Sequence, residues 1–117
     1  MGTIRALGFS PGRNPVVIDL HDEEIVENIN FFIFRDESDD RPITWYSFGG
    51  GLDLVFGETE EKRKEDFEPN RSLDDLGFDI RGHAIIVQHQ VDDEDTYVNM
   101  SDADIEKYTI RFSTRSG

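Results

Sequence analysis

The fold is decided by residues 67–108, at whose centre residues 82–90 read G-H-A-I-I-V-Q-H-Q. Residues 84–87 (A-I-I-V) form a continuous apolar run that is too short for a helix. Gly82 precedes this run and lets the backbone enter it tightly, a pattern typical of a strand that is buried on both faces. We therefore expect residues 84–87 to form the central strand of the fold.

A turn motif precedes this strand, and an acidic segment follows it. Residues 67–73 read F-E-P-N-R-S-L, in which the Pro-Asn pair is typical of a turn. Residues 92–95 (D-D-E-D) are expected to form an acidic turn, and residues 97–98 a short strand that returns alongside the central one.

The C-terminal segment carries a helix-start pattern. Residues 101–104 (S-D-A-D) resemble a capping box in which Asp replaces Glu, so a helix is predicted to begin at Ser101. Ile105 and Tyr108 would share one face of that helix. Residues 109–112 either extend it or form a last strand.

The N-terminal half opens with strands. Residues 3–9 and 16–20 are separated by turn-forming residues, which predicts a hairpin. Acids at 22–24 favour the start of a short helix that ends at residues 28–30. The aromatic run at 31–34 (F-F-I-F) is interpreted as another buried strand.

Two further strands are expected on either side of a glycine triplet. Residues 43–48 and 52–56 are rich in β-branched, aromatic and other apolar side chains. Residues 49–51 match neither the P-loop nor the dinucleotide-binding spacing, so we interpret them as a turn or bulge. Residues 57–66 lack an apolar stripe and are expected to form a solvated loop.

These segments together predict one α+β domain over residues 1–117. Its core would be a mainly antiparallel sheet of five to six strands with two short helices. The chain has no cysteine, which excludes disulfides and thiol chemistry, and no apolar span long enough for a membrane helix. The N-terminus does not resemble a signal peptide, so we expect a cytoplasmic protein.

Net charge is the extreme property of the chain. Asp and Glu number 26 against 12 Lys and Arg, which gives a net charge of −14. A field of this sign repels nucleic acid and anionic membranes and favours basic partners. Adaptation to a salty cytoplasm would produce the same bias, because net charge acts first on solubility.

No catalytic or metal-binding pattern is present in the sequence. His83 and His89 would lie on the same strand face but about 20 Å apart, too far to share one metal ion. The acids from residue 92 to 104 fail the EF-hand pattern, so they indicate a negatively charged ridge rather than a calcium loop. A serine-nucleophile motif is also missing. We therefore expect a protein that is not an enzyme and that uses no cofactor.

Three segments resemble a known family. Residues 68–71 (E-P-N-R), 79–87 (D-I-R-G-H-A-I-I-V) and 101–108 (S-D-A-D-I-E-K-Y) are similar to a small domain family of unknown function. That family is carried by bacteriophages and plasmids, sometimes near antirestriction genes. The resemblance covers about the last half of the chain, and residues 36–48 and the loop after Gly57 depart from it. It implies an accessory protein of a mobile element, acting in the host cell, and attaches no catalytic residues.

Three functions follow as hypotheses. The first is a non-enzymatic acidic inhibitor that binds the basic surface of a host defence or nucleic-acid-processing protein. Its partner-binding ridge would consist of Asp92, Asp93, Glu94, Asp95, Asp102 and Asp104.

The second hypothesis is a small-ligand-binding protein that sequesters a nucleotide-like signal. It would use Arg71, Arg81 and His83, with the backbone of residues 49–51 as an anion seat. The third is a salt-adapted acidic domain whose partner the sequence does not reveal.

Overall fold

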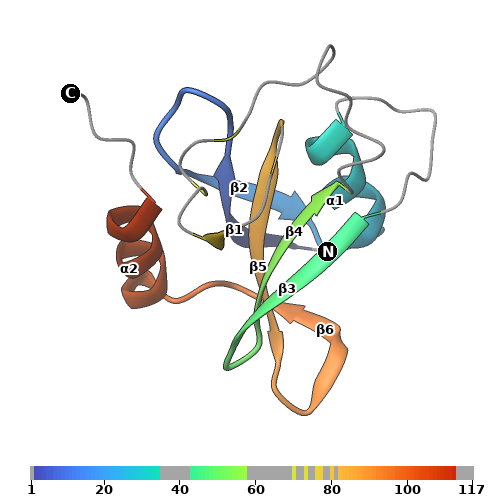
Figure 1. The fold of residues 1–117 in the computed structure, drawn as a ribbon. Helices are drawn as coiled ribbons and strands as arrows, with labels where there is room; N and C mark the ends of the chain where they lie inside the picture. The colour runs from blue at the N-terminus through green and yellow to red at the C-terminus, as the bar shows by residue number, and fades with distance from the viewer. Residues whose placement is uncertain are drawn as a thin grey trace.

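The sheet is organised around β5 (Ala84–Gln90), which pairs with three other strands (Figure 1). The computed structural model describes residues 2–34, 43–57, 70, 73, 76–77, 80 and 82–112, with the backbone alone at 30, 34 and 95. Residues 84–87 are fully buried, and their side chains alternate between two apolar clusters. The predicted central strand, buried on both faces, is confirmed.

The described residues form six strands and two longer helices. The elements are β1 (Thr3–Phe9), β2 (Val16–His21), α1 (Ile25–Phe34), β3 (Ile43–Gly49), β4 (Leu52–Gly57), β5, β6 (Asp93–Val98) and α2 (Asp102–Phe112). The sheet order is β2-β1-β5-β4-β3, with β6 paired to β5 outside this path, and every pairing is antiparallel. The predicted α+β fold and the opening hairpin are confirmed.

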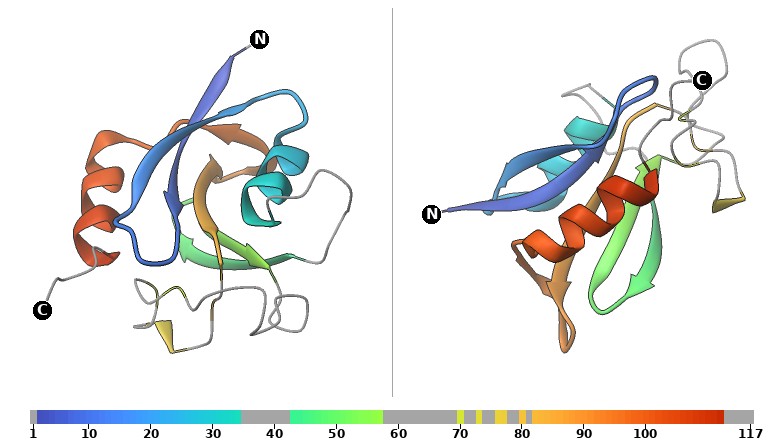
Figure 2. Two further views of the ribbon diagram at one scale, coloured as in Figure 1. Left: turned by 90° about the horizontal axis from the view of Figure 1, so that it is seen from above. Right: turned by 90° about the vertical axis from the view of Figure 1, so that its left-hand side faces the viewer.

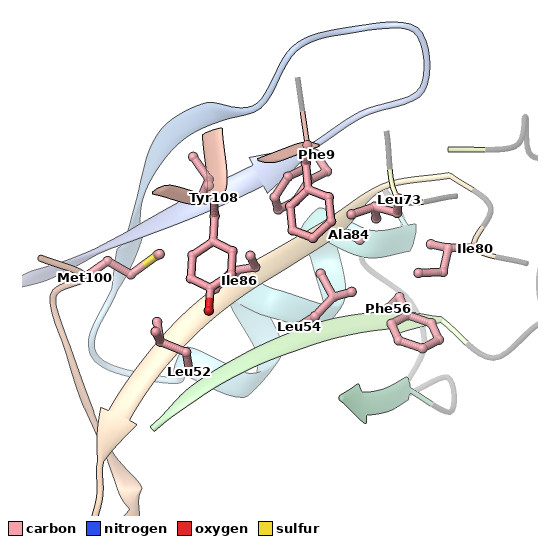
Figure 3. Close-up of a cluster of buried hydrophobic side chains, with 12 residues drawn as sticks. Phe9, Leu52, Leu54, Phe56, Leu73, Ile80, Ala84, Ile86, Met100 and Tyr108 are labelled. Carbon is pink, nitrogen blue, oxygen red and sulfur yellow. The ribbon is translucent and has the colours of Figure 1, made fainter. Parts of the chain in front are cut away.

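The two helices cover opposite faces of the sheet (Figure 2). On one face, Tyr108 and Phe112 of α2 pack against alternate residues of β4 and β5, such as Leu54 and Ile86 (Figure 3). On the other face, α1 packs against the residues between them. This alternation explains why β5 has no polar residue over its first four positions: each of its faces is covered by a helix.

The aromatic run at 31–34 belongs to α1, so its interpretation as a strand is wrong. The helix extends to Phe34 rather than ending at residues 28–30. Ile25, Ile29 and Ile33 are spaced by four residues, and Ile29 and Ile33 are fully buried against the sheet. Ile33 of the run therefore belongs to one buried helical face with Ile29, because residues four apart lie on the same side of a helix.

The acidic segment after β5 is mostly strand rather than turn. Val91 and Asp92 form the turn, and β6 begins at Asp93. Thr96 donates a hydrogen bond from its hydroxyl to the Asp93 carboxylate at 2.6 Å. A strand that carries several acids is tolerated here because exposed charges are common on strands at the edge of a sheet.

Asn70 anchors the segment that leads into β5. Its side-chain amide donates to the carbonyl of Gly82 at 2.9 Å, and its backbone N–H donates to the carbonyl of Ile80 at 2.8 Å. The side chain is buried, with 1 % exposed. Asn70 thus has a structural role, while Pro69, Phe67 and the loop at 58–66 lie outside the described residues.

The capping pattern at the start of α2 is confirmed. The Ser101 hydroxyl accepts a hydrogen bond from the backbone N–H of Asp104 at 3.2 Å and donates to the Asp104 carboxylate at 2.9 Å. Ile105 and Tyr108 face the core, and residues 109–112 extend the helix.

Ser101→Ala is expected to lower the free energy of unfolding by about 1 kcal/mol, because one helix-start N–H loses its acceptor. Urea unfolding followed by circular dichroism measures the loss. Ser101→Asp restores an acceptor and should recover most of it. Equal stability of the Ala and Asp variants would show that the cap does not stabilise α2.

Candidate functional site

An open groove lies at the end of the sheet where the β3–β4 and β5–β6 hairpins meet the first turn of α1. Its volume is about 530 Å³. Its described lining consists of Val26, Trp45, Ser47, Gly49, Gly50, Gly51, Asp53, His89, Glu94 and Tyr97. These residues come from α1, four strands and the turn between β3 and β4, so only the folded sheet brings them together.

Strand alternation places the polar floor of this groove. Asp53 lies on the same face of β4 as Val55, and His89 lies on the same face of β5 as Val87. Both positions continue the apolar face under α1 toward the hairpin end of the sheet. The first half of β5 pairs with β1, whereas its last residues pair with β6. The β5–β6 hairpin extends away from the rest of the sheet (Figure 1).

His89 and Asp53 form a polar side-chain pair at the floor of the groove. Nε2 of His89 lies 3.1 Å from Oδ2 of Asp53, and the two side chains are 13 % and 15 % exposed. Nδ1 of His89 lies 2.7 Å from the backbone carbonyl oxygen of Gln90. Because both neighbours are acceptors, the ring donates to both at once only as an imidazolium. The pair fixes the His89 ring at the floor of the groove.

Aromatic side chains form the walls. Trp45 is 39 % exposed and lies on β3 opposite Val55, while Tyr97 lies on β6 opposite His89. Val26, from the first turn of α1, is 48 % exposed at the rim. An exposed Trp in a concave site offers a large flat surface to a ligand.

The glycine triplet forms the turn between β3 and β4. All three residues have positive φ, and the pairing register shifts between Ser47 and Gly49. The turn-or-bulge prediction is therefore confirmed. Gly51 also contacts β5 directly: its carbonyl oxygen accepts a hydrogen bond from the backbone N–H of His89 at 2.8 Å.

The predicted acidic ridge divides into two groups. Residues 92–95 lie on the β5–β6 hairpin, where Asp92, Asp93 and Glu94 are exposed and Glu94 lines the groove. Asp102 instead forms an ion pair with Arg5 at 2.8 Å, and Asp104 completes the Ser101 cap. The hairpin acids are thus the part of the ridge that adjoins the groove.

The residues of the small-ligand hypothesis are not gathered at this groove. Arg71 and Arg81 lie outside the described residues. His83 is half-buried, with Nδ1 2.7 Å from the Ser10 hydroxyl and its ring 5.6 Å from that of Phe32. The Gly49–Gly51 backbone shares its groove with the carboxylates of Asp53 and Glu94, which favours a cation there over an anion.

Sequence reasoning missed Trp45, Asp53 and Tyr97 as site residues. Two signals were present: Trp45 is the single Trp of the chain, and Asp53 interrupts the apolar strand L-D-L-V-F. Within the part of the chain that the structure describes, no three His, Asp or Glu side chains are placed to hold a metal ion.

Comparison with protein-family models, with curated protein sequences and with solved structures gives no significant match to this chain. None of the described helices has the length and apolar character that crossing a bilayer requires.

Proposed function

We propose that this chain is a non-enzymatic acidic protein that inhibits a host defence or nucleic-acid-processing protein by binding its basic surface. The observation that carries the proposal is the acidic β5–β6 hairpin beside the groove. Asp92, Asp93 and Glu94 are exposed there, and the sequence contains no Lys or Arg from residue 82 to residue 106.

Electrostatic complementarity supports this function physically. Surfaces that bind nucleic acid use Lys and Arg to neutralise phosphates, so a projecting row of carboxylates can compete for the same side chains. Opposite charge also accelerates the encounter of the two proteins, most strongly at low salt. A hairpin at the edge of the sheet suits this role because its described acids Asp92, Asp93 and Glu94 are exposed and can reach the surface of a partner.

Three of the four described Lys and Arg side chains have partners outside the groove. Arg5 pairs with Asp102, and Lys107 and Arg111 lie over aromatic rings of the α2 face. None of the described residues that line the groove is Lys or Arg. A mobile-element origin belongs to the same proposal and rests on the motif resemblance in the second half of the chain.

Neutralising the hairpin is expected to abolish partner capture. The triple variant Asp92→Asn/Asp93→Asn/Glu94→Gln keeps the shape of each side chain and removes three charges. Immobilised protein is incubated with bacterial lysate, and the captured proteins are identified and eluted with a salt gradient. We expect the captured proteins to be basic and to bind nucleic acid, and we expect duplex DNA to displace them. They should also be released as salt rises, because the electrostatic screening length falls from about 10 Å at 0.1 M salt to about 3 Å at 1 M.

The matched control removes three exposed charges elsewhere, as Asp19→Asn/Asp22→Asn/Glu106→Gln. Capture by this control should stay close to that of the parent, while the hairpin variant should bind about tenfold more weakly or worse. Capture that resists both high salt and hairpin neutralisation would refute binding through charge. A captured nuclease that still cleaves DNA at full rate would refute inhibition.

A further inference from the structure

We infer that the groove is a receptor for a guanidinium group, supplied by an arginine side chain of the basic partner. This inference rests on the proposed function and deepens it, because it assigns one cavity and one side-chain chemistry to the contact. The hairpin acids would provide long-range attraction, and the groove would provide the short-range fit.

The chemistry of the lining matches a planar organic cation. Trp45 and Tyr97 supply aromatic rings, and a cation over such a ring is attracted by its electron-rich face. Asp53 and Glu94 supply carboxylates at the same groove, and none of the described lining residues is Lys or Arg. Stacking on an aromatic ring combined with carboxylate hydrogen bonding favours arginine over lysine, whose ammonium group is compact and strongly hydrated.

The geometry admits a side chain from outside. A volume of about 530 Å³ exceeds what one side chain needs, and the exposed fraction of Trp45 shows that its ring is open to solvent. Trp45 lies on β3, the last strand in the order of the described sheet. Asp53 is held at the floor by His89, whereas Glu94 at the rim is exposed and remains available to an incoming cation.

The single Trp makes the site directly observable. Intrinsic fluorescence of Trp45 is titrated with the peptide acetyl-Gly-Arg-Gly-amide, and in parallel with the same peptide carrying citrulline, which has nearly the same shape and no charge. We expect the arginine peptide to change the Trp45 emission in a saturable manner, with an affinity at least about tenfold above that of the citrulline peptide. An equal response to both peptides, or no response to arginine, overturns the inference.

Two variants with the same chemical change locate the binding. Glu94→Gln removes the rim carboxylate and should weaken arginine-peptide binding about three- to tenfold. Glu106→Gln makes the identical change on an exposed position of α2 and should leave binding unchanged. Equal effects of the two variants would show that the peptide senses net charge alone, which also overturns a groove-specific site.

The outcome separates this inference from the proposed function. If salt-sensitive capture of basic proteins persists while arginine peptides leave Trp45 unaffected, the proposed function stands and the groove is not its contact. If arginine peptides bind but lysate capture is insensitive to salt, the assignment of the groove to an inhibited partner is overturned.

Discussion

Ile86→Asp is expected to unfold the protein. Ile86 is fully buried on β5, with Leu7 of β1 and Leu54 of β4 as its cross-strand neighbours, and it packs in the cluster that α2 covers (Figure 3). A carboxylate at this position would be surrounded by apolar side chains. Burial of such a group without a partner costs several kcal/mol, against a total stability of about 5–15 kcal/mol.

Circular dichroism melts and expression in the soluble fraction measure this effect. Val91→Asp is the matched control, because it introduces the same carboxylate five residues later, where the side chain is 79 % exposed. Its stability should stay within about 0.5 kcal/mol of the parent. The stability of Asp93→Asn should also stay in this range, since Asn retains a side-chain oxygen that can accept the hydrogen bond from the Thr96 hydroxyl. An Ile86→Asp protein that melts like the parent would show that β5 is not central.

Most of the sheet could be predicted because its strands carry their signals locally. The apolar run of β5, the turn residues between β1 and β2 and the glycine triplet each constrain only their own neighbours in sequence. The cap at Ser101 is equally local. Each of these predictions is confirmed. None of them required knowledge of a contact between residues distant in sequence.

The end of α1 could not be predicted in the same way. Four consecutive apolar residues at 31–34 fit both a buried strand and the buried turn of a helix. The decisive observation is that Ile25, Ile29 and Ile33 are spaced by four residues, which indicates one helical face. This spacing becomes visible only when residues 25–30 are considered together with residues 31–34. Tertiary packing against β5 then selects the helix.

The groove could not be predicted because it depends on register. Asp53 and His89 are 36 positions apart in sequence, and they meet only because β4 and β5 pair with Asp53 opposite Val87. A shift of one residue would turn Asp53 to the α2 face and separate the two side chains. The acidic character of residues 92–95 could be predicted from the sequence, whereas the position of this hairpin beside Trp45 could not.

Gly51→Ala is expected to be strongly destabilising. Gly51 has a φ of +83°, and a β-carbon placed on it would overlap the backbone carbonyl oxygen of His89. The left-handed backbone costs a residue with a side chain about 1–2 kcal/mol, and overpacking against a neighbour adds about 1–3 kcal/mol. We therefore expect the free energy of unfolding to fall by about 2–5 kcal/mol.

Gly50→Ala separates the two contributions. Gly50 also has positive φ, at +64°, but a β-carbon there would meet no atom within 4 Å. Its loss of stability should be limited to the backbone cost of about 1–2 kcal/mol. Denaturant unfolding of both variants measures the difference, and the emission of Trp45 shows whether the adjacent groove is disturbed. Equal losses of stability in the Gly51→Ala and Gly50→Ala variants would mean that β4 and β5 can separate locally without cost at this end of the sheet. Asp53 and His89 could then not form a rigid floor for a ligand.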